Sequence, residues 1–152
     1  MLFRSGDHAF SVAQHCVLVE RICAHVNPGL DRQLRLAALL HDAPEYVIGD
    51  MISPFKAALG LDYKAFEIVL LGAIHVRFGL PAKIPVALTA QIKAADRIAA
   101  YLEATQLAGF TQAEGERYFG KPRGIEGEVF GLTPLAPNEA SALYLAKVRE
   151  LQ

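Results

Sequence analysis

The pair His41-Asp42 constrains this chain most, because it directly follows an apolar helical run that closes with Leu39-Leu40. A charged pair at the end of a buried run is costly to place unless something binds it. The dipole at a helix C-terminus favours a histidine there, but it disfavours an anion such as Asp42. The fold must therefore bring a binding partner to this pair.

Apolar residues spaced three and four positions apart predict helices along most of the chain. Ser11 and Gln14 have the spacing of a capping box, which predicts a helix from Ser11 to about Val26. Asp31 is the expected N-cap of a second helix. Because Pro44 disfavours helical geometry at the residue before it, this helix should end or kink beside His41-Asp42.

The rest of the chain reads as further helices joined by loops. These helices are expected over about 62–78, from 85 to beyond 102, and from 137 to about 148. Residues 109–136 contain many glycines and prolines and predict a long loop with at most one short helix. No segment predicts a strand convincingly, so the expected fold class is all-α.

Size and composition limit the possible classes of protein. One domain over 1–152 is expected, and a chain of 152 residues can bury a substantial core. The formal net charge of −1 gives no sign of a nucleic-acid-binding face. No apolar run reaches the roughly 18 residues of a membrane span, and the first residues lack the apolar core of a signal peptide. The hydrophobic content of 53% leaves room for a homodimer interface.

The two cysteines point to a reducing environment. Cys16 and Cys23 lie seven residues apart on one predicted helix. Seven residues span about 10 Å of helix, which is too far for an unstrained disulfide between them. Both are therefore expected to be buried free thiols, which fits a cytoplasmic location.

Four residues of metal-binding type come from three predicted helices: His15, His41, Asp42 and Asp96. Taken singly, His15 reads as a core or surface histidine and Asp96 as a partner for Arg97. Together, two imidazoles and two carboxylates suit a divalent ion such as Mn²⁺, Co²⁺, Ni²⁺, Fe²⁺ or Zn²⁺, with Mg²⁺ also open. Such sites are built between facing helices of a bundle. An octahedral ion would keep two positions for water and a phosphate oxygen.

Four blocks of sequence carry a family resemblance. They are Ser11-Val-Ala-Gln-His15, Leu39-Leu-His-Asp-Ala-Pro-Glu45, Ile48-Gly-Asp50 and Ala94-Ala-Asp96. In this order they resemble the HD-domain metal-dependent phosphohydrolases, and among them the bacterial 5'-deoxynucleotidase type. The resemblance implies an HD-domain helical bundle with one divalent metal ion between its helices. It assigns the metal to His15, His41, Asp42 and Asp96.

The resemblance also implies catalytic residues and a substrate. Glu45 would orient or deprotonate the attacking water, and Asp50 matches a second acidic position near the substrate. The implied substrate is a small-molecule nucleotide, a nucleoside or deoxynucleoside monophosphate that loses its 5'-phosphate. Asp50 also has an ordinary explanation as a loop carboxylate that caps the next turn. Lys56 is either a cation for the phosphate or a solvated lysine at a helix start.

Other readings fit less well. Guanosine tetraphosphate hydrolases of this family carry two consecutive acids where this chain has Glu45-Tyr46. Cyclic-nucleotide phosphodiesterases need extra histidines for a second metal, and His75 is the only one between Asp42 and Asp96. His75 reads as a surface or packing histidine. The alternative from another class is a regulatory or interaction module that keeps the metal but not efficient catalysis, although a purely structural metal needs neither Glu45 nor Asp50.

Overall fold

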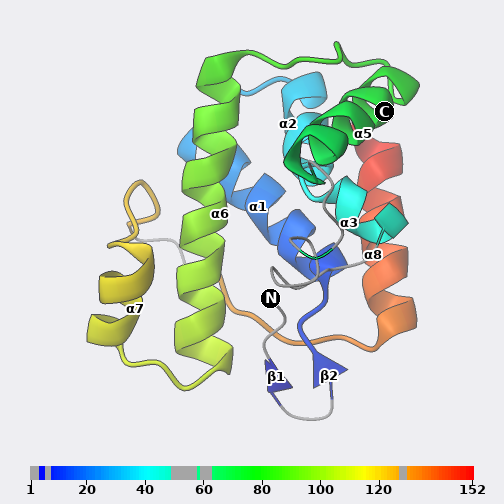
Figure 1. The fold of residues 1–152 in the computed structure, drawn as a ribbon. Coiled ribbons are helices and arrows are strands. Elements are labelled where there is room, and N and C mark those ends of the chain that lie inside the picture. Colours follow the sequence, from blue (N-terminus) through cyan, green and yellow to red (C-terminus); the bar gives the residue numbers. More distant parts are fainter. Residues whose placement is uncertain (1–3, 6–7, 49–57, 59–62, 127–129) are drawn as a thin grey trace.

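The computed structural model describes residues 4–5, 8–48, 58, 63–126 and 130–152, and most of them lie in a bundle of helices (Figure 1). In chain order these are α1 (Val12–Val26), α2 (Arg32–Leu39), α3 (Ala43–Ile48), α5 (Tyr63–Arg77), α6 (Val86–Leu107), α7 (Gln112–Phe119) and α8 (Pro137–Leu151). The predicted all-α fold class is confirmed. Asp50, predicted to lie near the substrate or to cap a turn, and Lys56 lie outside the described residues.

Two very short strands precede the bundle. β1 (Arg4–Ser5) pairs with β2 (His8–Ala9) in antiparallel register. The expectation of no strand was therefore wrong at this point. Strands of two residues are too short to show the alternation of apolar and polar side chains by which a strand is predicted.

Both predicted N-caps are present. The Ser11 hydroxyl accepts a hydrogen bond from the Gln14 N–H at 3.2 Å, and the Asp31 carboxylate accepts one from the Leu34 N–H at 2.9 Å. Each satisfies one of the free N–H groups that begin a helix. The first helix ends at Val26, as predicted.

The Gln14 side chain does not complete the predicted capping box. Its amide nitrogen donates to the Thr133 carbonyl at 2.9 Å, and its amide oxygen accepts from the Leu135 N–H at 3.0 Å. The glutamine thus satisfies two backbone groups of the segment before α8 instead of the backbone of its own cap. This contact fixes the C-terminal segment to the start of α1.

Helix α1 is the centre of the bundle. It packs against α2, α6 and α8, and Figure 1 shows it crossing between α6 and α8. Cys16, Val19 and Ile22, which are spaced three residues apart along the helix, are fully buried. Cys23 is also buried. α7 packs against α6, where Gly115 allows close approach, because a Cβ at this position would lie 2.7 Å from the Tyr101 ring.

A buried charge cluster ties α1 to its neighbours. Glu20 on α1 is fully buried, and its Oε1 lies 2.7 Å from the Arg35 Nε on α2. Its other carboxylate oxygen lies 3.6 Å from the Lys147 Nζ on α8. A carboxylate buried without such partners would be strongly destabilising. No sequence pattern predicted this cluster.

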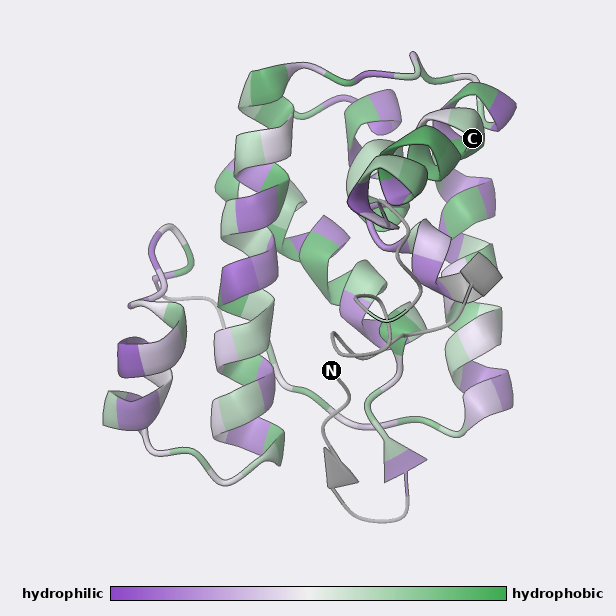
Figure 2. Ribbon diagram, viewed as in Figure 1, coloured by the Kyte–Doolittle hydropathy of each residue, from purple (hydrophilic) through white to green (hydrophobic). Residues whose placement is uncertain are grey.

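Helix α5 differs from the others in its exposure. Figure 2 shows it as a largely hydrophobic ribbon, yet Phe66, Ile68 and Val69 are 52%, 59% and 71% exposed. Large exposed apolar side chains in one region are typical of interaction surfaces. The homodimer stays a prediction, and this helix is where it would be sought. Among the described helices, none is both long enough and apolar enough to cross a membrane.

Candidate metal centre

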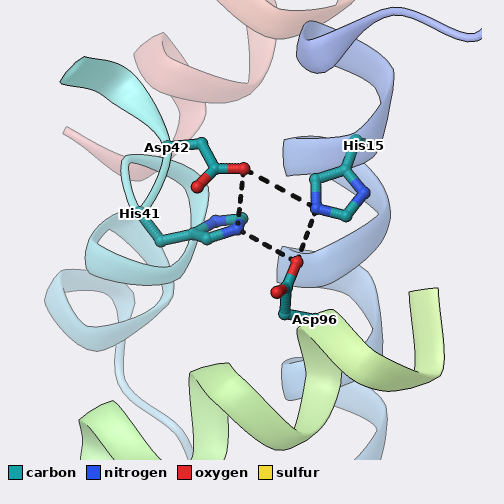
Figure 3. Close-up of side chains that lie close together, drawn as sticks. All are labelled: His15, His41, Asp42 and Asp96. Carbon is teal, nitrogen blue, oxygen red and sulfur yellow. Dashed lines mark hydrogen bonds and ion pairs between the residues drawn. The ribbon is translucent and has the colours of Figure 1, made fainter. Parts of the chain in front are cut away.

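The structure brings together the four predicted metal-binding residues (Figure 3). His15 comes from α1, Asp96 from α6, and His41 and Asp42 from the turn between α2 and α3. One nitrogen or carboxylate oxygen from each lies within 4.8 Å of the others. Residues separated by up to 81 positions in the chain thus point at one small volume in the bundle.

The turn that carries His41 and Asp42 is set by its neighbours. α2 ends at Leu39 and α3 begins at Ala43, so the pair occupies the turn between them. The Ala43 N–H donates to the Leu40 carbonyl at 2.9 Å, which closes this turn. Leu39 and Leu40 are buried and anchor it. The prediction that the helix ends beside His41-Asp42 is confirmed.

The distances show two imidazoles alternating with two carboxylates. His15 Nε2 lies 2.7 Å from Asp96 Oδ1, and His41 Nε2 lies 3.6 Å from the same oxygen. Asp42 Oδ2 lies 3.3 Å from His41 Nε2 and 3.8 Å from His15 Nε2. Two neutral nitrogen ligands and two anionic oxygen ligands in one place are a common set for first-row divalent ions.

His41 gives a separate test of whether these residues fit a metal ion. Its Nδ1 lies 2.8 Å from the Ala38 carbonyl oxygen, which can only accept, so Nδ1 carries the proton. Its Nε2 is buried and makes no hydrogen bond within the described part of the chain. A buried nitrogen that lacks a hydrogen bond is costly, and Asp42 at 3.3 Å and Asp96 at 3.6 Å give this one ion-pair contacts only. A divalent ion among the four side chains would satisfy it, so the donor set fits the metal.

The four groups also shift one another's pKa values. Burial lowers the pKa of His15, but hydrogen bonds to Asp96 and Glu103 outweigh it and raise that pKa to about 9. Burial likewise lowers the pKa of His41, but Asp42 and Asp96 raise it to about 10. Burial raises the pKa of Asp96, yet the two histidines hold it well below its usual range. Without metal, the site is therefore a cluster of ion pairs.

Metal affinity should rise with pH. A proton and a divalent ion compete for the same Nε2 atoms, and His15 and His41 keep their protons up to pKa values of about 9 and about 10. Binding near neutral pH should release about two protons per ion, so the Kd for Mn²⁺ should fall as pH rises and level off above both pKa values. Calorimetry in buffers of different ionisation enthalpy counts the protons released. A release of zero would contradict this description.

Glu45 lies beside the four ligands. It is half-buried in the first turn of α3. A cavity of about 290 Å³ is lined by Glu45 together with His15, Asp42 and Asp96, and the rest of its lining includes Glu103 and Phe119. The carboxylate predicted to act on water therefore shares a cavity with three of the predicted ligands. Asp50 and Lys56 lie outside the described residues.

A larger cavity of about 400 Å³ borders His41 but none of the other three ligands. Its lining is mainly apolar and comes largely from α5 and α6. His75 is part of that lining and is buried, with its Nδ1 3.2 Å from the Ala82 carbonyl oxygen. His75 is thus a packing histidine outside the metal cluster, in agreement with the interpretation of the sequence.

Glu103 is the residue of the site that the sequence analysis missed. It is buried on α6, and its Oε1 lies 2.7 Å from the His15 Nδ1. A signal was present, because Glu103 follows Asp96 by seven residues and therefore lies on the same face of the helix, two turns along. An acid between Leu102 and Ala104, on a face with a predicted ligand, indicates a polar partner.

Comparison with known proteins places the chain in a family. Residues 12–101 match the HD domain family. The chain is 50% identical over 143 residues to an uncharacterized protein of Rhodobacter capsulatus, an alignment that covers 94% of this chain and 73% of that protein. It is 32% identical over 146 residues to the uncharacterized protein YfdR of Escherichia coli, covering 95% of this chain and 73% of that protein.

The chain therefore belongs to the HD-domain family, whose members are in general metal-dependent phosphohydrolases. The resemblance drawn from the sequence is confirmed at the level of the family. The position of His15, His41, Asp42 and Asp96 in one cluster agrees with the divalent metal that HD domains bind.

Proposed function

We propose that this protein is a divalent-metal-dependent phosphomonoesterase of the 5'-deoxynucleotidase type. It removes the 5'-phosphate from nucleoside or deoxynucleoside monophosphates. The observation that carries the proposal is that Glu45 lines the same cavity as His15, Asp42 and Asp96. A metal ion held only for stability needs no half-buried carboxylate beside it.

The cavity supports a compact substrate. Its volume of about 290 Å³ is close to the lower limit of the roughly 300–1,000 Å³ of small-molecule sites. Acidic and imidazole groups occupy one part of the lining, while Val12, Ala100 and Phe119 supply apolar surface. A phosphate at the metal ligands would leave the sugar and base against that apolar surface. Phe119 is the aromatic side chain available there for contact with a base.

The residues present support hydrolysis by an attacking water. When bound, a divalent ion would orient the phosphate, stabilise charge on the phosphoryl oxygens and lower the pKa of water. Glu45 accepts the proton of the attacking water as general base. The water oxygen bonds to phosphorus, and the bond from phosphorus to the 5'-oxygen breaks with its electron pair on that oxygen. The proton that Glu45 took from water then passes to the 5'-oxygen, so that nucleoside and inorganic phosphate leave. On the basis of the resemblance, Asp50 is proposed as a second acidic residue near the substrate, which acts with Glu45 or hydrogen-bonds a sugar hydroxyl.

Nucleoside monophosphates should be hydrolysed and cyclic nucleotides should not. Within the described residues only one cluster can hold a metal ion, whereas clamping of a phosphoryl group by two metals needs a second ligand set. The chain has no Trp, and few base contacts are expected, so the different bases should be accepted at comparable rates. Steady-state phosphate release from metal-loaded protein tests this. Faster hydrolysis of a cyclic nucleotide than of any monophosphate would overturn the proposal.

The alternative is a regulatory or interaction module that binds metal without efficient catalysis. The two functions are separated by adding Mn²⁺, Co²⁺ or Mg²⁺ to metal-free protein and assaying a panel of nucleotides. An enzyme releases phosphate from at least one monophosphate, and Glu45→Gln abolishes most of that release. A module binds the ion, gains thermal stability from it, and releases no phosphate from any of them.

A further inference from the structure

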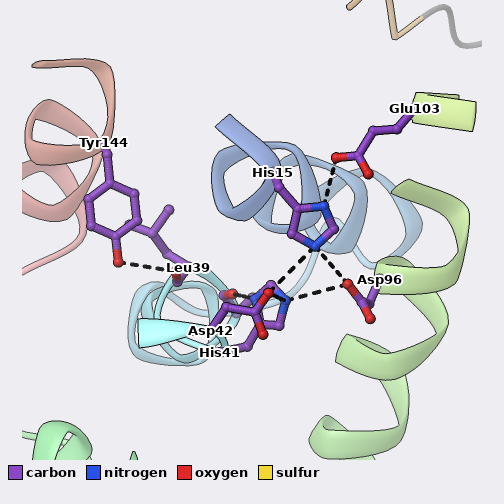
Figure 4. Close-up of polar contacts among 8 residues, drawn as sticks. His15, Leu39, His41, Asp42, Asp96, Glu103 and Tyr144 are labelled. Atoms are coloured by element: carbon purple, nitrogen blue, oxygen red, sulfur yellow. Dashed lines mark hydrogen bonds and ion pairs between the residues drawn. The ribbon is translucent and has the colours of Figure 1, made fainter. Parts of the chain in front are cut away.

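The His15 ring is held between two carboxylates. Its Nε2 faces Asp96 at 2.7 Å, and its Nδ1 faces Glu103 Oε1 at 2.7 Å. Figure 4 shows Glu103 and Asp96 on opposite sides of the ring, both projecting from α6. Glu103 is only 3% exposed, so water competes little for this contact.

This arrangement decides which nitrogen of His15 is free for a metal. A carboxylate oxygen accepts hydrogen bonds and has no proton to donate, so the Nδ1 at 2.7 Å from Glu103 Oε1 carries the proton. The lone pair of the neutral ring is then on Nε2, which is the atom that belongs to the metal cluster. Histidine ligands of metal ions are commonly oriented in this way by a carboxylate or carbonyl on the second nitrogen.

Glu103 does not belong to the ligand set itself. The cluster of atoms within 4.8 Å of one another comprises His15, His41, Asp42 and Asp96 and leaves Glu103 out. Its oxygen contacts the ring nitrogen that points away from the cluster. The effect of Glu103 on a bound ion must therefore pass through His15.

We propose that Glu103 is a positioning residue that fixes the tautomer and the orientation of His15 and makes its Nε2 a stronger ligand. The proposal rests on the proposed function, because it requires a metal ion at the four-residue cluster. The Nδ1 of His41 has a neutral acceptor, the Ala38 carbonyl, which orients the ring in the same way but through a weaker hydrogen bond. A carboxylate on His15 raises the basicity of the ring more than a carbonyl does, so the ion should depend strongly on Glu103.

The test compares variants of two buried glutamates. Glu103→Leu replaces the glutamate by an apolar side chain of similar size and so removes the acceptor. Glu103→Gln keeps an oxygen that can accept from Nδ1. The matched control is Glu20, an equally buried carboxylate on α1 that pairs with Arg35 and Lys147 and makes no contact with the cluster. Each variant is stripped of metal and titrated with Mn²⁺ by calorimetry. Thermal melting is recorded for every variant.

Glu103→Leu should weaken Mn²⁺ binding by about 10- to 100-fold, the usual scale for removing such a partner. Glu103→Gln should lose less affinity. Glu20→Leu and Glu20→Gln should lower the melting temperature but leave the Mn²⁺ Kd within about twofold of wild type. In wild type loaded with diamagnetic Zn²⁺ in place of Mn²⁺, ¹⁵N NMR should show the proton of His15 on Nδ1.

Three results would overturn the inference. The first is wild-type Mn²⁺ affinity in Glu103→Leu, and the second is an equal loss of affinity in the Glu20 variants, which would make the effect one of general stability. The third is a loaded wild-type protein with the His15 proton on Nε2. A wild-type protein that binds no ion overturns the proposed function together with this inference, whereas the first three results leave the proposed function intact.

Discussion

Asp42→Ala should lose the divalent ion. Asp42 Oδ2 lies between both imidazoles, 3.3 Å from His41 Nε2 and 3.8 Å from His15 Nε2. Removing it takes away one of two anionic ligands and leaves two half-buried, protonated rings with one fewer counter-charge. Purified wild type should hold about one ion per chain, and the variant should hold less than about a tenth of that after dialysis. Metal analysis by plasma mass spectrometry measures both.

The control for this substitution is His75→Ala. His75 is also a buried histidine, but it lines the apolar cavity and stays outside the ligand cluster. The His75→Ala variant should retain the ion, although loss of the buried ring lowers the stability of the protein. A chelator should lower the melting temperature of wild type and of His75→Ala, but not that of Asp42→Ala. Loss of the ion from His75→Ala with retention in Asp42→Ala would show that the ligand set is wrong.

Glu45→Gln should keep the ion but lose turnover. The side chain lines the cavity beside Asp42 and Asp96 but is not among the four clustered ligands. An amide of the same shape cannot accept a proton from water at neutral pH, so kcat for a nucleoside monophosphate should fall about 10²-fold or more, with Mn²⁺ affinity nearly unchanged. Parallel measurements of kcat and of the Mn²⁺ Kd check both parts.

Near-normal turnover in Glu45→Gln would remove Glu45 from the mechanism. A large loss of metal affinity in the same variant would instead identify Glu45 as a ligand. Arg35→Gln is a useful companion variant, because Arg35 pairs with Glu20 on another part of α1 and should leave kcat unaffected.

Much of the fold follows from local rules that the sequence displays. The helix boundaries near Val26, Asp31 and Pro44 depend on capping and on proline geometry, which act within a few residues. The polar pair His41-Asp42 was informative because it follows buried leucines. The convergence of His15 and Asp96 on that pair was inferred from family order, since spacing alone does not fix how three helices pack.

The features of the structure that the sequence did not predict depend on tertiary contacts. Gln14 had the spacing of a capping box, yet its side chain satisfies backbone groups near Thr133 and Leu135 because the C-terminal segment passes beside it. Glu20 and Glu103 looked like ordinary acids on helices. Their burial becomes tolerable through partners such as Arg35 in one case and His15 in the other. Such partners lie 15 and 88 positions away, beyond the reach of local patterns.

The decisive experiment measures phosphate release from a deoxynucleoside monophosphate by metal-free protein as Mn²⁺ is added. The four-residue cluster predicts no release in chelator, activity that appears with Mn²⁺, and saturation at about one ion per chain. Asp42→Ala should stay inactive over the same titration. Equal phosphate release with and without chelator, or full activity in Asp42→Ala, would contradict the account of this site.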